Sequence, residues 1–145
     1  MKRLILGFIL ALGVSFAYAQ GNQLCYTSNG SNCIPGIQAA KSVAINTASA
    51  TTVELVAAET GKTVYVSSWD ILAGGTTIVT FKYGTGTNCG TGTVSLTGPY
   101  PFAISVAIAK GNGLGSIFNI PQGNALCVTN SQAVQISGAV SYTQF

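Results

Sequence analysis

Residues 63–83 read TVYVSSWDILAGGTTIVTFKY, and this stretch decides the fold class. Residues 63–73 and 76–83 are two runs rich in β-branched and aromatic side chains, which favour strands. In the second run, Val79, Phe81 and Tyr83 lie on one face, at the two-residue period of a strand. Gly74 and Gly75 lie between the runs and can supply the positive φ angles of a tight turn. The stretch therefore predicts a β-hairpin of two long antiparallel strands.

The same alternation recurs on both sides of this hairpin, between turns rich in Gly, Ser, Thr and Asn. No stretch of residues 20–145 has the 3.6-residue apolar period of an amphipathic helix. Eight or nine short strands with a turn roughly every ten residues are typical of an antiparallel sandwich. We therefore expect an all-β fold, an antiparallel β-sandwich of jelly-roll or immunoglobulin-like type, over residues 41–145. Beyond the hairpin, strands are expected near 43–45 and 53–57 and over 93–97, 102–109, 116–120, 125–129 and 133–142.

The alternation also predicts which side chains fill the core. Residues 102–109 are expected to form one strand with its apolar side chains on one face. An error of one residue in a strand's register would turn its whole apolar set toward solvent. The expected core consists of Val53, Leu55, Val64, Val66, Val79, Phe81, Phe102, Ile104, Val106, Val134, Ile136 and Val140.

Residues 1–19 have the three parts of a secretory signal peptide. Lys2 and Arg3 give a positive start, an apolar run follows, and Ala17 and Ala19 are the small residues that a signal peptidase requires. A membrane anchor is the alternative, but it needs about 20 consecutive apolar residues, and this run is shorter. We expect cleavage after Ala19, which leaves an exported chain without a membrane span. Its location would be periplasmic, extracellular or on a virion surface.

Four cysteines, Cys25, Cys33, Cys89 and Cys127, remain after this cleavage. An even number of cysteines in an exported chain indicates disulfides, and four cysteines allow three pairings. Cys25 and Cys33 flank a polar turn and are the natural local pair, which leaves Cys89 with Cys127 as a long-range pair. A zinc site is the alternative, but the chain has no CxxC motif and no histidine. We expect two disulfides, with residues 20–40 as a disulfide-tied N-terminal arm.

Charged residues are few, which limits the possible functions. Only 6% of the 145 residues are charged, and residues 20–145 contain four lysines against three carboxylates. A net side-chain charge of +1 gives no field to hold a phosphate backbone, so no nucleic-acid partner is expected. Without histidine, the chain lacks the usual general base, nucleophile activator and metal ligand. We therefore expect no enzyme, no catalytic residue, no metal and no cofactor.

The motifs that could carry chemistry have simpler structural interpretations. Glu54, Glu59 and Asp70 are spread along the chain, and only Asp70 lies in a strand that is otherwise apolar, where a lysine or backbone donors could pair with it. Residues 84–92, GTGTNCGTG, lack the GxxxxGK motif of a P-loop and the third glycine of a dinucleotide fingerprint. A disulfide-stapled loop explains this stretch better. Six aromatic residues could form a sugar platform, but several alternate in register with core residues: Tyr65, Trp69, Phe81, Tyr83, Tyr100 and Phe102.

Several phrases of the chain, taken in order, resemble one group of proteins. They are TGKTVYVSSWDILAGGT, FKYGTGTNCGTGT, LTGPYPF and PQGNALCVTNSQAVQISGAVSYTQF, all within residues 41–145. Together they are similar to small exported β proteins that recur in tailed-phage, prophage and environmental viral sequences. The combination of YGTGTNCGTGT with the later GNALC is the most specific, and it would match the pairing of Cys89 with Cys127. By analogy, the resemblance implies a virion-associated or cell-surface structural protein, and it implies no set of catalytic residues.

We therefore expect a non-enzymatic exported structural or surface protein, an assembly subunit with protein partners that self-associates or docks on a larger assembly. One alternative is a secreted glycan-binding module that uses Tyr and Trp at loop ends. The other is a small outer-membrane β-barrel, which the terminal Phe145 suggests. In a strand, every second residue before Phe145 would lie on the same face as Phe145, and these residues are Thr143, Ser141, Ala139 and Ser137. A lipid-facing strand should carry apolar residues at these positions.

Overall fold

The computed structural model describes residues 24–25, 33–34, 41–111 and 115–145. The chain divides into two compact units, residues 1–36 and residues 37–145. In the first unit, β1 (Leu24–Cys25) and β2 (Cys33–Ile34) pair antiparallel. The predicted signal peptide and most of the predicted arm lie outside the described residues. Within the described part, no helix is both long enough and apolar enough to cross a membrane.

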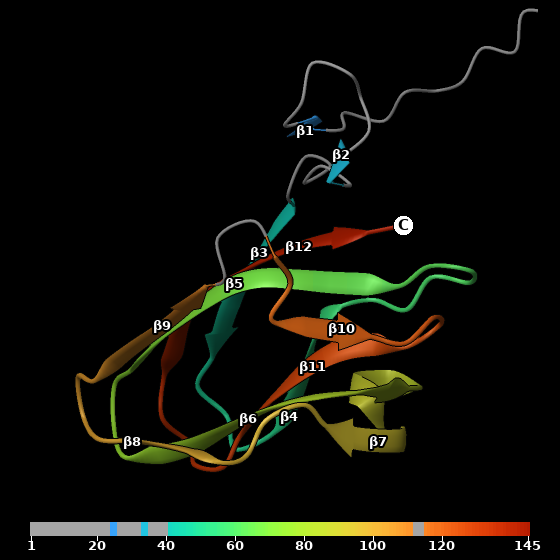
Figure 1. Cartoon of the computed structure of the whole chain (residues 1–145). Coiled ribbons are helices and arrows are strands. Elements are labelled where there is room, and N and C mark those ends of the chain that lie inside the picture. The colour runs from blue at the N-terminus through green and yellow to red at the C-terminus, as the bar shows by residue number, and fades with distance from the viewer. Residues whose placement is uncertain (1–23, 26–32, 35–40, 112–114) are drawn as a thin grey trace, which may run out of the picture. The chain divides into compact units, whose positions relative to one another are not determined.

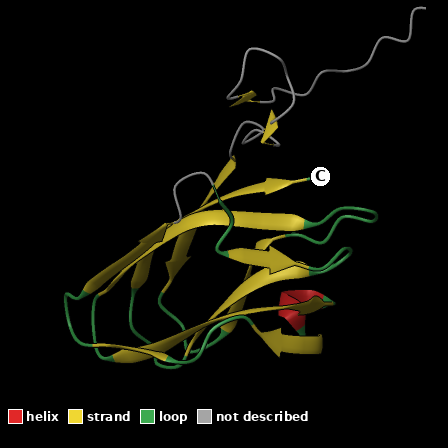
Figure 2. Cartoon of the chain, in the orientation of Figure 1, coloured by secondary structure: helices red, strands yellow, loops and turns green. Residues whose placement is uncertain are grey.

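The second unit is a sandwich of two antiparallel five-stranded sheets (Figure 1). One sheet, called the β5 sheet here, contains β3 (Lys41–Thr47), β5 (Val64–Ala73), β9 (Ala107–Gly111), β10 (Phe118–Ile120) and β12 (Ile136–Gln144). The other, the β6 sheet, contains β4 (Thr52–Val56), β6 (Thr77–Thr85), β7 (Thr91–Ser95), β8 (Tyr100–Phe102) and β11 (Ala125–Asn130). A single 3-10 turn, η1 (Thr87–Cys89), is the only helical element among the described residues (Figure 2). The all-β antiparallel sandwich is thus confirmed, with ten strands in this unit instead of eight or nine.

Both sheets have one continuous edge and one divided edge. In the β5 sheet the order is β3, β12, β5, and then β9 and β10 pair with successive parts of β5. In the β6 sheet the order is β4, β11, β6, and then β8 and β7 pair with successive parts of β6. The consecutive strands β3 and β4, β5 and β6, and β11 and β12 lie in different sheets. The chain therefore crosses repeatedly from one layer of the sandwich to the other.

Side chains from the facing surfaces of the two sheets form one core. Trp69, Phe81 and Phe102 are its largest members, and the ring centroids of Trp69 and Phe81 are 5.0 Å apart. Val53 and Leu55 were predicted for the core and lie half-buried against it. Seven other predicted core residues are buried as expected: Val64, Val66, Val79, Phe81, Phe102, Ile136 and Val140.

The predicted hairpin turn at Gly74 and Gly75 is wrong. Residues on both sides form strands, but β5 and β6 belong to different sheets, and neither glycine has a positive φ angle. The crossing packs against the neighbouring crossing from β11 to β12. The N–H of Gly74 donates to the carbonyl oxygen of Gln135 (2.8 Å), and a Cβ on Gly75 would lie 2.8 Å from Cγ1 of the half-buried Val134. The two glycines therefore allow this connection to pack closely against the one from β11 to β12. In the sequence, a Gly-Gly pair looks the same whether it forms a tight turn or such a close-packed connection.

The predicted single strand over 102–109 is also wrong. It consists of parts of β8 and β9, which lie in different sheets and are separated by a turn. Ser105 in this turn has a φ angle of 59°, and its N–H donates to the carbonyl oxygen of Ala73 (2.8 Å). Ile104 and Val106, which were predicted for the core, are therefore 68% and 39% exposed. In the sequence, the alternation of apolar residues continues through this turn. It therefore gave no sign that β8 ends and β9 begins here.

A β-bulge in β5 keeps both halves of this strand facing the core. Val66 pairs with Tyr142 and Ser68 pairs with Ser141, so Ser67 is an extra residue in β5. Without this extra residue, one half of the strand would turn its apolar side chains to solvent. The buried residues accordingly change from even to odd positions at the bulge: Val64, Val66, Trp69, Ile71 and Ala73.

A hydrogen-bond network stabilises the crossing from β11 to β12. The hydroxyl of Thr77 donates to Oδ1 of Asn130 (2.6 Å), and Nδ2 of Asn130 donates to the carbonyl oxygen of Val134 (2.8 Å). The hydroxyl of Ser131 accepts from the N–H of Ile78 (2.9 Å). Thr77 and Asn130 are buried, and these bonds satisfy polar groups that would otherwise be costly to bury.

Gly138 allows β12 to lie close to β5, and a side chain at this position is expected to destabilise the fold. An added Cβ would lie 2.8 Å from the carbonyl carbon of Asp70 and 3.1 Å from Cα of Ile71. Both are backbone atoms of a central strand, which cannot move without disturbing the pairing. We expect Gly138→Ala to lower the free energy of unfolding by about 2 to 3 kcal/mol, measured by urea denaturation.

Gly98 provides the matched control, because an added Cβ there would meet no atom within 4 Å. Gly98→Ala should change the free energy of unfolding by less than about 0.5 kcal/mol. An equal loss in both variants would show that the close approach of the two strands at Gly138 is not the cause.

Candidate functional site

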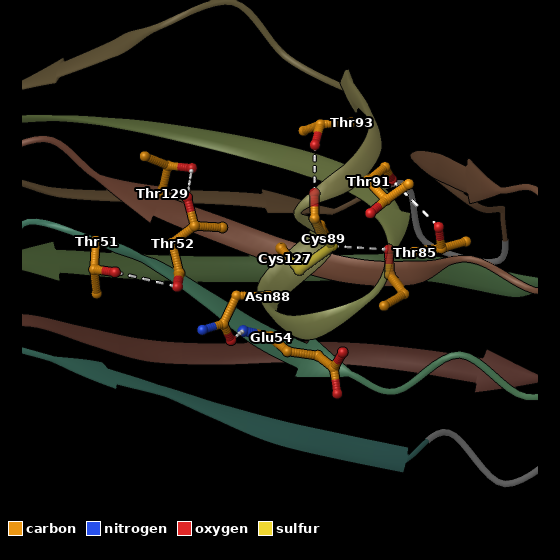
Figure 3. The surroundings of a disulfide bond; sticks show 11 residues. Thr51, Thr52, Glu54, Thr85, Asn88, Cys89, Thr91, Thr93, Cys127 and Thr129 are labelled. Atoms are coloured by element: carbon orange, nitrogen blue, oxygen red, sulfur yellow. Dashed lines mark hydrogen bonds between the residues drawn. A yellow bond between two sulfur atoms is a disulfide. The ribbon is translucent and has the colours of Figure 1, made fainter.

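The candidate site is the loop between β6 and β7, which a disulfide attaches to the outer face of the β6 sheet (Figure 3). The predicted bond between Cys89 and Cys127 is confirmed, and the two Cα atoms are 6.3 Å apart. Leu126 and Val128 belong to the main core, so Cys127 between them points to the opposite face of β11. Cys89, Ala125 and Cys127 form a second, small buried cluster on that face.

Gly84 lies beneath this loop and leaves room for it. A Cβ at Gly84 would lie 2.8 Å from the carbonyl oxygen of Thr91 and 3.3 Å from Cβ of Cys89. Because Gly84 has no side chain, the loop packs directly on the sheet. This glycine therefore has a packing role.

The loop backbone has one defined shape. Asn88 and Cys89 have φ angles of 50° and 56°, and Gly86 has a φ angle of 71°. The N–H of Cys89 donates to the carbonyl oxygen of Gly86 (3.2 Å), and the hydroxyl of Thr93 donates to the carbonyl oxygen of Cys89. Two consecutive non-glycine residues with positive φ are uncommon. The disulfide and these hydrogen bonds hold them in that conformation.

Asn88 connects the loop to a third strand. Its Oδ1 accepts a hydrogen bond from the backbone N–H of Glu54 in β4, at 3.1 Å (Figure 3). The loop thus begins at β6, is bonded covalently to β11 and reaches the edge strand β4. Sequence reasoning missed the role of Asn88, because no local pattern indicates a contact across 34 positions.

The outward surface of the loop is neutral and polar. Residues 84–95 read GTGTNCGTGTVS and contain no charged side chain. Thr85, Thr87, Asn88 and Thr91 are exposed. This surface offers hydroxyl, amide and peptide groups in fixed positions and no group that titrates near neutral pH. It can therefore form hydrogen bonds to a partner, but it has no general acid or base.

The three carboxylates lie on different elements, and only Glu54 borders the stapled loop, through the hydrogen bond from its backbone N–H to Asn88. Glu54 is exposed on β4, and Asp70 is exposed on β5, opposite Ala109 of β9 and Ala139 of β12. Among the described residues, no three His, Cys, Asp or Glu side chains gather where they could hold a metal ion. A lysine was one of the two partners considered for Asp70, and among the described residues the ion pair found is that of Lys62 with Glu59, while the cross-strand neighbours of Asp70 are alanines.

Glu59 lies in the turn before β5 and forms an ion pair with Lys62, whose Nζ is 2.5 Å from Oε2. The hydrogen bond from Lys62 lowers the pKa of Glu59 below its usual value. Because the pKa of Glu59 is lower in the folded state than in the unfolded chain, its ionised form stabilises the fold at pH values above the ordinary pKa. This contribution is lost as the pH falls through the pKa of the folded state. Both side chains of this ion pair are well exposed, so solvent screens their attraction and the pair contributes little to the stability of the whole fold.

The six aromatic residues considered as a sugar platform do not form one exposed surface, and most of them pack in or against the core, as expected. Trp69, Phe81 and Phe102 are buried in the core. Tyr65 is half-buried on the outer face of the β5 sheet, where its ring stacks on Phe145 with centroids 4.9 Å apart and planes 17° apart. Phe145 is 53% exposed. Sequence reasoning did not predict this pair, which depends on the pairing of β12 with β5.

The predicted disulfide between Cys25 and Cys33 stays a prediction, since their side chains lie outside the described part. Their backbones are direct cross-strand partners in the β1–β2 ladder. Opposite residues of an antiparallel pair have Cα atoms about 4.5 to 5.5 Å apart, within the range of disulfide geometry. The backbone register is therefore compatible with the expected bond.

Comparisons with protein-family models, with curated proteins and with solved structures found no match to this chain. What the site can do therefore follows from its own chemistry. Its chemistry is that of a rigid, uncharged, hydrogen-bonding surface on a disulfide-bonded sandwich.

Proposed function

We propose that this chain is an exported, non-enzymatic structural protein of a virion or cell surface. In this role it is an assembly subunit that associates with copies of itself or docks on a larger assembly. The observation that carries the proposal is the strand order of the sandwich. The neutral stapled loop and the exposed apolar side chains support it.

We infer that the sandwich is a jelly roll. If β7 and β8 count as one divided strand and β9 and β10 as another, the sandwich has eight strand positions. We number these positions along the chain, so that β3 is the first and β12 is the eighth. Across the β5 sheet the order of positions is then 1-8-3-6, and across the β6 sheet it is 2-7-4-5. Two interlocked Greek keys give this order, which is that of the jelly rolls found in viral capsid and lectin domains. The order supports surface assembly by analogy of fold.

Exposed apolar side chains also support a role in protein contacts. Leu72 on the outer face of β5 is 48% exposed, and it pairs with Ala107 of β9. Ile104 and Val106 lie in the turn before β9, and Val106 accepts a hydrogen bond from the N–H of Ala73. Large apolar side chains gathered on a surface indicate a contact with another molecule. The disulfide is compatible with an oxidising compartment outside the cytosol.

Attachment through such surfaces is expected to survive removal of every carboxylate. The triple variant Glu54→Gln, Glu59→Gln, Asp70→Asn should co-purify with particles or cell envelopes within about threefold of the wild type, because no contact requires a titrating group. Density-gradient fractionation with immunogold negative-stain microscopy measures this. Attachment should also vary little between pH 5 and 8. Loss of attachment on changing Glu54 alone, in a variant that still folds, would contradict the structural role and indicate an ion-dependent site.

A second candidate function, glycan binding, is favoured by the stacked pair of Tyr65 and Phe145. The backbone N–H groups of Thr63 and Phe145 each donate to the carbonyl oxygen of the other residue (2.9 and 3.2 Å), so the backbone of Phe145 is anchored beside Tyr65. The cross-strand neighbours of Tyr65 are Asn119 and Thr143, which add an amide and a hydroxyl beside the rings. Aromatic rings beside neutral polar groups suit the apolar face and the hydroxyls of a sugar.

This candidate predicts saturable binding to a neutral polysaccharide that depends on Tyr65. Tyr65→Ala should weaken binding by about 3- to 10-fold, as expected for the loss of one aromatic stacking contact. Leu72→Ala, on the same face of β5, is the matched control and should leave binding unchanged. Isothermal titration with cell-wall polysaccharide measures both. Absence of saturable binding by the wild type, or equal loss in the two variants, would contradict glycan recognition at Tyr65.

A further inference from the structure

The edges of the two sheets are protected unequally. An edge strand presents unpaired N–H and C=O groups, and proteins protect edges by keeping strands short, by adding charges or by covering them. The divided edges consist of short strands, β8 and β10 with three residues each and β7 and β9 with five each. Edge strand β4 carries the charge of Glu54, and the stapled loop reaches it through Asn88. These three edges therefore have a recognisable protection.

The remaining edge, β3, is neither short nor covered in the part of the chain that the structure describes. It has seven residues, KSVAINT, with no proline, and its only charge is at Lys41, the first residue. It pairs with β12 over all seven positions, so its backbone is fully extended. In the part of the chain that the structure describes, no strand pairs with its other edge. Such an edge is a template for adding another strand.

We propose that β3 pairs antiparallel with β3 of a second copy, so that the two β5 sheets join into one continuous sheet. This inference rests on the proposed self-association and names the surface that performs it. A two-fold axis at Ala44 uses all seven residues of each strand. It places Val43 opposite Ile45 of the other copy and Lys41 opposite Thr47.

The sequence of β3 is complementary to itself in this register. Val43 and Ile45 both face the core side, since they pair with Val140 and Gly138 of β12. Each would meet an apolar residue of the second copy on the same side of the joined sheet. No two like charges lie opposite each other, because Lys41 faces an uncharged residue. A shift that brought the two lysines together would pair fewer residues and would be repulsive.

The test introduces a like charge at the two-fold axis. Ala44 is exposed and points away from the core, so Ala44→Lys should fold normally. In the dimer, the two introduced side chains would lie directly opposite each other. An interface of one strand pair is at the small end of specific interfaces, so we expect a dissociation constant of roughly 100 μM for the wild type. Ala44→Lys should raise it at least tenfold in analytical ultracentrifugation.

Two further variants separate pairing from a general effect of charge. Ala107→Lys makes the same change at an exposed alanine on the opposite edge of the β5 sheet, and it should leave the dissociation constant unchanged. Ala44→Glu should also weaken the dimer, but an equimolar mixture of Ala44→Glu and Ala44→Lys should restore association. Amide hydrogen exchange in β3, and not in β9, should slow as the protein concentration rises.

Three outcomes would overturn the inference. They are a wild type that stays monomeric up to about 1 mM, an equal effect of Ala44→Lys and Ala107→Lys, and a mixture that associates no better than its components. None of these outcomes decides whether the protein attaches to particles or envelopes, which fractionation measures separately. Conversely, a β3 dimer that never associates with particles or envelopes would overturn the proposed function and support the edge pairing.

Discussion

Replacing Cys89 and Cys127 together by alanine is expected to lower the free energy of unfolding by about 4 kcal/mol. The disulfide closes a loop between residues 38 positions apart, and cross-linking restricts the unfolded chain more than the folded one. The loop would also lose the bond that holds it on the outer face of β11. Chemical denaturation followed by Trp69 fluorescence measures the change, since Trp69 is buried in the core.

Asn88→Ala is the control for this prediction, because it keeps the disulfide and removes only the hydrogen bond to Glu54. It should lower the free energy of unfolding by about 1 kcal/mol. A loss below about 1 kcal/mol for the double cysteine variant would show that the packing of η1 on Gly84, and not the covalent bond, holds the loop.

Phe81→Ala is expected to be as damaging, with a loss of about 3 to 5 kcal/mol in the free energy of unfolding. Phe81 is fully buried at the centre of β6. Its ring lies between two other rings, with centroids 5.0 Å from Trp69 and 5.6 Å from Phe118. Truncation leaves a cavity that the β-sheets on either side cannot close, because both are held by continuous backbone pairing.

Ile78→Ala is the matched control, since Ile78 lies on the outer face of the same strand and is 45% exposed. It should lower the free energy of unfolding by less than about 1 kcal/mol. The near-ultraviolet spectrum of Trp69 should change in Phe81→Ala and not in Ile78→Ala. Equal losses in the two variants would contradict the assignment of the inner face of β6.

Local alternation was enough to predict the strands and most of the core. In β6, Val79 and Phe81 are separated by Thr80 and followed by Lys82, and both are buried as predicted. The long-range disulfide followed from the number of cysteines and their positions. The strands follow from alternation within each strand, and the disulfide follows from the number and positions of the cysteines. A sequence contains both kinds of information directly.

The connections between strands could not be predicted in the same way. Gly74 and Gly75 suit both a hairpin turn and a close-packed crossing between layers, and only the neighbouring crossing at Gln135 decides between them. The turn at Ser105 interrupts an apolar alternation that continues in the sequence. Each of these features depends on residues that are distant in the chain.

The stapled loop could be predicted only in part. The position of Cys89 indicated a loop held by a disulfide, but the contact between Asn88 and Glu54 joins two polar residues with no pattern of their own. The stacking of Tyr65 on Phe145 likewise follows from the register of β12 along β5, which is shifted at the bulge. Sequence reasoning therefore located the loop but missed the contacts that shape its surface and the exposed aromatic pair.

The pairing of β3 with β12 has a consequence for how the protein is made. Lys41 lies opposite Tyr142, so the first strand of the sandwich finds its partner about a hundred residues later in the chain. Contacts of such long sequence separation form slowly, and the sheet cannot close until β12 has been synthesised. A nascent chain would therefore remain unfolded while it is translated. Such a delay would serve the proposed export, because a chain that is still extended can pass through a secretion channel before it folds and before Cys89 and Cys127 are oxidised.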